Sequence, residues 1–317
     1  MATWGKRLGW GLAIAVGLVG AAYAAAVAVR AQTLAKVWEV PRTVDFPVPF
    51  PLDPAEAADA GEGADVDRVA MEQAVQRGRR LIQTRLGCFE CHGPDLAGGV
   101  MIDSPVMGAL YGPNITAGGV TKGWGPADWD RIVRHGIMHD GHTSVMPAID
   151  YARLSDRELS DVIAYARSVP SSDKVMPPPR FGPLLNLLVA TGQITTAASV
   201  IDHAAVPPQQ PPPAEPNVAF GAHIAESCKG CHGRTFSGGP IEGGDPAWPA
   251  ASNLTPTGLA DASFEDFDAA LRHGKTRRGE RMPPPMPWQA YAGMTDVEVQ
   301  ALWAFFRSLP PMETGAR

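Results

Sequence analysis

Two short cysteine motifs contain the residues whose types and spacing are best suited to chemistry. The four cysteines of the chain read Cys88-Phe-Glu-Cys91-His92 and Cys228-Lys-Gly-Cys231-His232. Each motif is Cys-x-x-Cys-His, the attachment signature of c-type haem. The two thiols bond the vinyl groups of one haem, and the adjacent histidine reaches the iron as the proximal ligand. The sequence therefore predicts two covalently bound haem c groups.

Two other chemistries use pairs of cysteines. A redox dithiol would not need the histidine, and a structural zinc site would usually pair its ligands differently. Both alternatives also fail to explain why the same five-residue pattern occurs twice. We therefore expect Cys88, Cys91, Cys228 and Cys231 to hold haem, with His92 and His232 as ligands of the two irons.

The sixth iron ligand is predicted from spacing. Met146 follows His92 at the same interval at which Met286 follows His232. Both methionines precede a proline, and a methionine thioether opposite a histidine raises the reduction potential of a haem. A single methionine would more often be a filler of the core. The equal spacing in two places instead favours Met146 and Met286 as iron ligands.

Other candidate ligands lie close to these methionines. Met282 lies four residues before Met286, and His139 and His142 lie shortly before Met146. None of the three has a counterpart at the matching place near the other haem motif. Spacing favours Met286 over Met282, although Met282 remains an alternative.

The chain contains an internal repeat. Its two copies are offset along the sequence by the separation between Cys88 and Cys228. Four further pairs recur in the same order at nearly this offset: Asn114-Ile-Thr with Asn253-Leu-Thr, Arg134-His135-Gly136 with Arg272-His273-Gly274, Met146-Pro147 with Met286-Pro287, and Arg167-Ser-Val-Pro170 with Arg307-Ser-Leu-Pro310. An ordered set of matches at one offset indicates two duplicated domains.

Each copy predicts the same three helices. A first helix leads into the haem motif, at about 67–85 and 217–226, and a middle helix follows at 126–135 and 263–273. The last helices begin after the N-cap signals Ser155 and Thr295, with Glu158 and Glu298 in their first turns. Pro170 and Pro310 end them. The predicted fold class is all-α.

The N-terminus predicts export of the rest of the chain. Lys6 and Arg7 precede an uncharged apolar run, Leu8–Val29. This run is long enough to span a membrane, and a cleaved signal peptide is the alternative. The positive-inside tendency keeps Lys6 and Arg7 in the cytoplasm. We expect an inner-membrane protein whose haem domains face the periplasm, the side on which haem c is attached.

Chain length and net charge limit the possible number of domains and the possible partners. The 317 residues suit two domains, and a net charge of −6 makes nucleic-acid binding unlikely. The expected divisions are an anchor or signal peptide at 1–30, an extended acidic linker at 31–66, a first haem domain at 67–170, an inter-domain linker that ends in a Pro-rich stretch at 171–216, a second haem domain at 217–310 and a tail at 311–317.

This pattern resembles class I cytochromes c, and in particular membrane-anchored dihaem cytochromes with two such domains in tandem. The resemblance covers about 67–170 and 217–310. In that family a small residue of the first helix packs against an aromatic residue of the last, which implies that Gly78 meets Tyr165 and Gly221 meets Phe305. The Asn-Ile/Leu-Thr and Arg-His-Gly blocks look like those of cytochrome subunits that serve membrane dehydrogenases. Those subunits commonly have three haem motifs, whereas this chain has two.

Three further sets of residues have roles that spacing leaves open. Asn114 and Asn253 would bond near a haem or form turns, and His135 and His273 would cap the middle helices. A run of five bases precedes Met286, and would be a solvated loop or a surface that attracts an acidic partner: Arg272, Lys275, Arg277, Arg278 and Arg281.

Two His/Met-ligated irons have no open coordination site, so the sequence predicts an electron carrier rather than an enzyme. Single electrons would pass between a dehydrogenase, a terminal oxidase or another cytochrome. The alternative is a dihaem enzyme, of the peroxidase or sulfur-compound oxidoreductase type, in which one iron is open. A third possibility is that the chain is a subunit of a larger membrane complex. It would still carry electrons, and residues 181–190 would form its contact surface.

Overall fold

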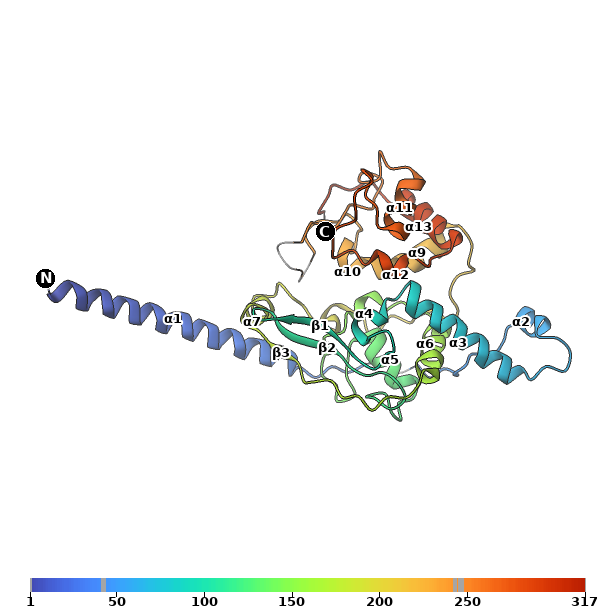
Figure 1. The fold of residues 1–317 in the computed structure, drawn as a ribbon, viewed down its shortest axis with the longest axis horizontal. Helices are drawn as coiled ribbons and strands as arrows, with labels where there is room; N and C mark the ends of the chain where they lie inside the picture. The colour runs from blue at the N-terminus through green and yellow to red at the C-terminus, as the bar shows by residue number, and fades with distance from the viewer. Residues whose placement is uncertain (1, 41–43, 242–243, 245–247, 317) are drawn as a thin grey trace.

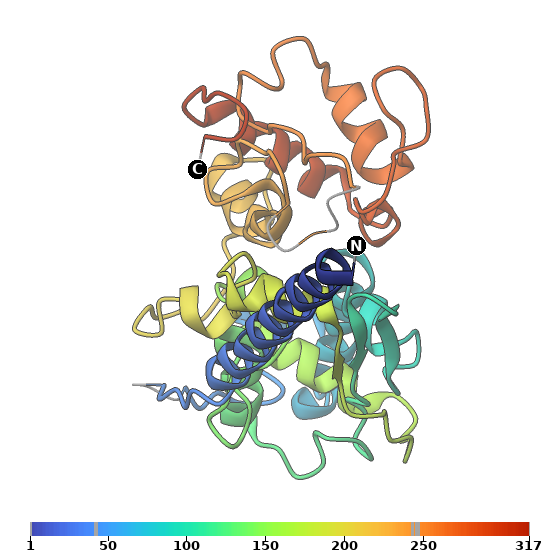
Figure 2. The ribbon, with the colours of Figure 1, turned by 90° about the vertical axis from the view of Figure 1, so that its left-hand side faces the viewer.

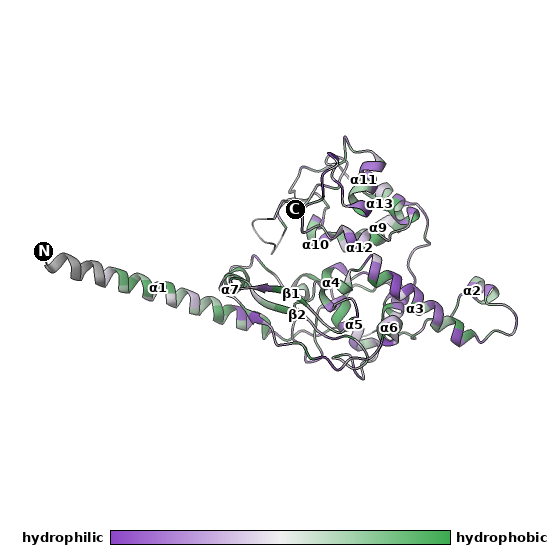
Figure 3. Cartoon of the chain, in the orientation of Figure 1, coloured by the Kyte–Doolittle hydropathy of each residue, from purple (hydrophilic) through white to green (hydrophobic). Residues whose placement is uncertain are grey.

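A long helix leads into two helical domains that lie side by side (Figures 1 and 2). The computed structural model describes residues 2–40, 44–241, 244 and 248–316, with the side chains of 2–9 excepted. Helix α1 spans Ala2–Leu34. Of the helices described, it is the one long and apolar enough to cross a membrane, and it is predominantly apolar along the stretch that extends away from the domains (Figure 3).

The first domain is built around helices α3, α5 and α6. Helix α3 spans Val66–Thr84, α5 spans Pro126–His135 and α6 spans Asp156–Ser168. A short helix, α4, spans Cys88–His92, and a 3₁₀ turn, η1, spans Ala148–Asp150. The predicted first, middle and last helices are therefore confirmed, with ends that differ by one or two residues.

A small antiparallel sheet in the first domain was not predicted. Strand β1 (Gly99–Ser104) pairs with β2 (Gly108–Gly112), which pairs with β3 (Arg180–Phe181). The glycine-rich sequence between the haem motif and Asn114 reads as a loop. Its pairing depends on residues 180–181, which lie far away in the sequence. The predominantly helical fold class nevertheless stands.

The second domain repeats the helical plan with shorter elements. Helix α9 spans Val218–Ala225, η2 spans Glu226–Cys228 and α10 spans Lys229–His232. Helix α11 spans Phe264–His273, α12 spans Trp288–Tyr291 and α13 spans Asp296–Ser308. In the part equivalent to β1 and β2, Gly239 and Ala251 form an antiparallel bridge.

The predicted caps of the last helices are confirmed. The Ser155 and Thr295 side chains accept hydrogen bonds from the backbone N–H groups of Glu158 and Glu298, and the two glutamates accept in return from the cap N–H groups. This reciprocal capping box satisfies N–H groups that the first helical turn leaves unpaired. Both sequences therefore start the last helix at the same repeat position.

The first and last helices of each domain cross at a glycine. A Cβ atom built on Gly78 of α3 would lie 1.9 Å from the Asp161 carbonyl oxygen and 2.9 Å from the Tyr165 Cβ. On Gly221 of α9 it would lie 2.0 Å from the Ala301 carbonyl oxygen and 2.7 Å from the Phe305 Cβ. The predicted crossings are therefore confirmed.

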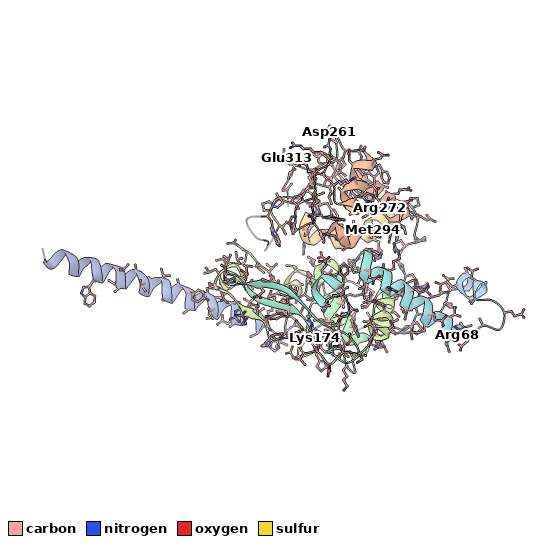
Figure 4. The ribbon with its side chains drawn as sticks, in the orientation of Figure 1. Arg68, Lys174, Asp261, Arg272, Met294 and Glu313 are labelled. Carbon is pink, nitrogen blue, oxygen red and sulfur yellow. The ribbon has the colours of Figure 1, made fainter. Side chains whose placement is uncertain are left out.

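The Arg-His-Gly repeat joins the middle helix to the last one. Arg134 pairs with Asp130 at 2.7 Å and with Asp156 at 2.9 Å. In the second domain Arg272 pairs with Asp268 and, at 2.7 Å, with Asp296. Its guanidinium also donates to the Met294 carbonyl oxygen at 3.3 Å, and both residues are labelled in Figure 4. The arginine thus holds the start of the last helix.

The glycine of the Arg-His-Gly repeat has the same role in both domains, whereas the histidine does not. Gly136 and Gly274 adopt φ values of 65° and 59°, the left-handed conformation that closes a helix. His135 is buried, and its Nδ1 lies 2.9 Å from the Nδ1 of His203, whereas His273 is exposed. The expectation that both histidines cap helix ends does not describe His135, whose ring contacts a distant segment.

Residues 31–66 are not simply a solvated, extended linker. Phe46 is 5% exposed and belongs to the core cluster of the first domain. Helix α2 spans Pro54–Asp59, and its Glu56 pairs with Arg77 at 3.2 Å and with Arg157. The acidic composition of this stretch suggested solvation, but isolated apolar residues within it pack inward.

Residues 171–216 are likewise attached to the first domain. They include β3, helix α7 (Pro183–Ala190) and helix α8 (Ala197–Val200). The carbonyl oxygens of Pro208 and Gln209 accept hydrogen bonds from the N–H groups of Asp156 and Arg157, at 2.9 and 3.0 Å. The Pro-rich tract therefore supplies acceptors to the first turn of α6 and is not a free spacer.

Two ion pairs related by the repeat join the domains. Arg80 of the first domain pairs with Glu298 of the second, and His223 of the second domain lies 2.8 Å from Glu158 of the first. Arg80 and His223 each lie two residues after the crossing glycine, and the two glutamates occupy equivalent capping positions. The interface is therefore pseudo-symmetric, like that of a two-fold dimer in which each subunit repeats the contact of the other.

Glu158 is the buried centre of this interface. Its carboxylate pairs with Arg85 and His223, and all three side chains are less than a tenth exposed. Burial alone would raise the pKa of Glu158, but the charges of Arg85 and His223 and their hydrogen bonds outweigh it and lower the pKa well below the ordinary value. The domains are thus joined through a desolvated, paired carboxylate.

We predict that Glu158→Gln lowers the free energy of unfolding by about 3 kcal/mol at pH 7, because it leaves the buried Arg85 charge uncompensated. The exposed pair of Glu72 with Arg68 offers a matched control, and Glu72→Gln should cost less than about 0.5 kcal/mol. Since folding lowers the pKa of Glu158, its contribution is present above the ordinary value of 4.5 and fades as the pH falls below it. Chemical unfolding of the haem-loaded protein between pH 3 and pH 8 measures both effects. Equal losses in the two variants at pH 7 would refute the assignment.

We predict that Gly78→Ala destabilises the first domain by roughly 1–3 kcal/mol, because the new methyl group meets the backbone of α6. The same substitution at an exposed helical glycine would stabilise by about 0.5–1 kcal/mol. Gln76→Ala, at an exposed site on the same helix, is the control and should change stability little. Circular dichroism melting curves measure the difference, and an unchanged melting temperature for Gly78→Ala would contradict the close crossing.

Candidate functional site

The first cysteine motif forms helix α4, directly after α3. One helical turn places Cys88, Cys91 and His92 close together, with Cys88 packed against the core cluster of the first domain. The four cysteines of the chain form no disulfide. In the second domain the same motif spans η2 and α10, with Cys228 packed against the second core.

The buried thiols lack the environment of reactive cysteines. Burial, with a smaller effect from Cys91, raises the pKa of Cys88 to about 12. Burial, then the charges of Asp150 and Cys231, raises the pKa of Cys228 to about 12. A redox dithiol or a zinc site needs thiolates, which nearby positive charge or a metal would stabilise. Protonated thiols beside an apolar core instead suit conversion to neutral thioethers.

Each histidine is oriented by a backbone carbonyl. His92 donates from Nδ1 to the Pro113 carbonyl oxygen at 2.8 Å, and His232 donates in the same way to Ser252 at 2.8 Å. Burial lowers the pKa of both rings, although these hydrogen bonds oppose the shift. The neutral ring therefore has Nε2 left for an iron, the arrangement that metal-binding histidines use.

The two candidate methionines pack against the core clusters. Met146 lies against the first cluster and Met286 against the second. Met282 is not among the residues that pack on the described second cluster; its N–H donates to the Gly274 carbonyl oxygen at 2.6 Å in the preceding hairpin. The packing supports the choice of Met286 that spacing had favoured.

These donors fit two haem c groups. Each domain offers two partly buried thiols, an imidazole with a free Nε2 and a thioether, and the first cysteine and the methionine of each set pack on the same apolar cluster. No group of three or more His, Cys, Asp or Glu residues suited to a metal ion occurs among the described residues.

Asn114 and Asn253 clamp chain segments and do not need a haem partner. Asn114 donates from Nδ2 to the carbonyl oxygens of Ser172 and Lys174, at 2.7 and 3.1 Å, and its Oδ1 accepts from Thr116. Asn253 donates to Met312 at 2.8 Å and accepts from Thr255 in the same pattern. Each clamp adjoins the residue that holds the haem-motif histidine, so turn formation is the correct role.

Each haem motif lies against a loop of the other domain at the domain interface. Asp150 of η1 accepts a hydrogen bond from the Gly230 N–H at 2.9 Å, within the second motif. Ala290 has the equivalent place in the second domain and lies beside Gly87 at the start of α4. Sequence comparison of the copies misses Asp150 because its counterpart is alanine.

Two tyrosines of the repeat also face this interface. The Tyr151 hydroxyl donates to the Leu86 carbonyl oxygen at 2.9 Å, just before the first motif. Burial raises the pKa of Tyr151 and of Tyr291 well above the ordinary value, and nearby acidic groups add to the rise. Burial raises the pKa of Asp150 to about 7, although the bond from Gly230 opposes this. These buried polar groups lie between the two motifs.

The run of bases before Met286 divides into two parts. Arg272 is the structural residue described above, whereas Lys275, Arg277, Arg278 and Arg281 lie on the hairpin that follows α11, where all four are exposed. The equivalent loop of the first domain carries His139 and His142, and Val37 bridges to His142 there. The basic surface therefore belongs to the second domain.

Family comparisons identify both domains. Residues 73–165 match the family described as cytochrome c oxidase, cbb3-type, subunit III, and residues 218–310 match cytochrome c. The two matched segments lie within the copies defined by the internal repeat.

Among similar proteins of known function, the gluconate 2-dehydrogenase cytochrome c subunit of Pantoea cypripedii is 39% identical over 99 residues, which cover 28% of this chain and 22% of that protein. The cytochrome subunit of fructose dehydrogenase from Gluconobacter japonicus is 30% identical over 131 residues, 37% of this chain and 27% of its own length. The cytochrome c subunit of the quinone alcohol dehydrogenase from Gluconacetobacter polyoxogenes is 29% identical over 275 residues, 75% of this chain and 56% of the relative. This chain thus spans between about a fifth and somewhat over half of these relatives.

We predict that Asn114→Ala lowers the free energy of unfolding by about 2 kcal/mol, because it removes the partner of the buried Thr116 N–H and of two partly buried carbonyl groups. Ser172→Ala is the matched control, since Asn114 bonds to the carbonyl oxygen of Ser172 and that oxygen remains. Chemical unfolding of both variants, with haem content checked by absorbance, measures the effect. If the control loses as much stability as Asn114→Ala, the clamp is not the cause.

Proposed function

Because the chain is a dihaem cytochrome c with two cytochrome c domains in tandem, we propose that it is the membrane-anchored electron-carrying partner of a dehydrogenase. When bound, the haem irons supply one-electron oxidation and reduction. The protein's residues attach the cofactors, set their axial ligands and bring the two domains together. The relatives named above are cytochrome subunits of dehydrogenases, which supports a donor of that class.

The proposed ligand sets are the same in both domains. Cys88 and Cys91 attach the first haem, between His92 and Met146. In the second domain, Cys228 and Cys231 attach the haem, between His232 and Met286. One observation carries this proposal: each domain repeats a carbonyl-bonded histidine and a core-packed methionine at the same separation along the chain.

Such irons have no site for a substrate, so we propose a carrier and not a catalyst. With haem bound, His92 and Met146, or His232 and Met286, would hold each iron from two sides. Electron exchange with the partner then needs contact between surfaces rather than a binding pocket. The bases Lys275, Arg277, Arg278 and Arg281 would favour encounters with an acidic partner at the second domain.

We further propose that α1 holds the protein at the inner membrane, with both domains in the periplasm. The support is the length and apolar surface of α1 and the position of Lys6 and Arg7 ahead of its apolar run. Covalent haem attachment on the exported side requires the same orientation.

We predict that Met286→Leu abolishes the methionine–iron charge-transfer band of the second haem, and that the reduced variant binds carbon monoxide. The matched control in the same loop is Met282→Leu, which should leave both properties unchanged. Met146→Leu should open the first iron in the same way, so Met146→Leu/Met286→Leu should bind two carbon monoxide molecules per chain.

The native protein supplies the decisive comparison in this experiment. Its reduced spectrum should not change when carbon monoxide is added, since both irons are closed. A carbon monoxide adduct on the native protein would overturn the carrier proposal and indicate a reactive iron. Loss of the band in Met282→Leu would reassign the ligand within the loop.

A further inference from the structure

Helix α7 belongs to the longest uncharged stretch outside α1. Residues 181–201 contain no Asp, Glu, Lys or Arg, and α7 itself reads Pro-Leu-Leu-Asn-Leu-Leu-Val-Ala. Leu185 and Asn186 are buried, whereas Leu187 is 43% exposed. Leu187 thus presents a large apolar side chain on the outer face of a helix that has no charged residue, which makes this face a candidate contact surface.

The inner face of α7 is fastened to α1 by one buried polar residue. Asn186 is 2% exposed; its Oδ1 accepts from Arg30 Nε at 3.0 Å, and its Nδ2 donates to the Tyr23 hydroxyl at 3.1 Å. The Arg30 guanidinium also lies 4.6 Å from the centre of the Phe181 ring. These contacts place α7 beside the stretch of α1 between Tyr23 and Arg30, and the two helices are adjacent in Figure 1.

The same stretch of α1 is where a bilayer would end. The uncharged run Leu8–Val29, which follows Lys6 and Arg7 and ends at Arg30, is roughly 33 Å long at 1.5 Å per residue, close to the hydrocarbon thickness of about 30 Å. From Trp10 to Val19 its large apolar side chains are 59–73% exposed in the structure, and Ala26 is the first buried residue along the described part of the helix. A tyrosine followed by an arginine is typical of the boundary between hydrocarbon and water.

We propose that α7 is an interfacial helix that lies on the periplasmic lipid surface, with Leu187 directed into the acyl boundary. This inference rests on the proposed anchoring by α1. The occupant is lipid because the apolar face is continuous with the membrane-spanning helix, so the bilayer that surrounds α1 also reaches α7.

The turn of the neighbouring sheet lies beside α7 and adds one exposed apolar residue. The N–H of Leu184 donates to the Val106 carbonyl oxygen at 3.1 Å, and the Gly182 N–H donates to Met107 at 2.9 Å. Val106, in the turn between β1 and β2, is 53% exposed. Two attachments, α1 and α7, would hold the first domain at a fixed height and orientation on the membrane, whereas a single anchor would let it swing.

Site-directed spin labelling of the full haem-loaded chain tests the proposal. The four native cysteines are taken up by haem attachment, so Leu187→Cys introduces a single free thiol. The chain is inserted into vesicles of phosphatidylethanolamine and phosphatidylglycerol, and relaxation by oxygen, which partitions into hydrocarbon, is compared with relaxation by a water-soluble nickel chelate. Val175→Cys, at a residue that is 89% exposed in the same domain, is the matched control.

We expect the label at position 187 to be relaxed several-fold more by oxygen than by nickel, and the label at 175 to show the reverse. Equal nickel access at both positions, with the chain retained in the vesicles, would overturn the α7 proposal and leave the anchor intact. Loss of the chain from vesicles after an alkaline wash would overturn the anchor itself. Shielding of position 187 from both reagents would mean that protein covers α7, which would also overturn the lipid assignment.

Discussion

The close crossing of the first and last helices is the contact on which each domain depends. Gly78 and Gly221 allow the backbones to approach until the space for a Cβ is filled by a carbonyl oxygen of the facing helix. The haem motif begins within a few residues of the end of the first helix, and the methionine loop ends just before the last helix. Crossing these two helices therefore brings the cysteine motif and the methionine loop to one apolar cluster. The middle helix is then held by an arginine that reaches the start of the last helix.

The duplication extends from the domains to the contact between them. The capping glutamates Glu158 and Glu298 close the first turns of their own helices and also accept from the other domain. Their partners, Arg80 and His223, follow the two crossing glycines at the same distance. The same two glutamates thus stabilise the last helix of each copy and the contact between the copies. Because this interface places Asp150 against the second haem motif and Ala290 beside the start of the first, we infer that electrons pass between the two domains across it.

Much of this plan was predictable because it is local or repeated. The haem motifs, the caps at Ser155 and Thr295 and the helices depend on short-range patterns that occur twice, and the glycine crossings were implied by the family resemblance. Features that depend on distant partners were missed. Phe46 looked like part of an acidic linker, β2 needed Arg180 and Phe181, and the Pro-rich tract turned out to supply acceptors to α6. Asp150 and His203 make their contacts only because folding brings distant residues beside them, and neither belongs to a repeated sequence pattern.

Flash reduction of the ferric protein shows whether electrons pass from one domain to the other across this interface. Ferric protein receives less than one electron per molecule from a photogenerated reductant, and the absorbance change that follows as the electron settles between the two haems is recorded at several protein concentrations. If the two domains exchange electrons across their shared interface, the rate of this change is independent of protein concentration. A rate that rises in proportion to concentration would show that electrons pass only between molecules, and would contradict the account.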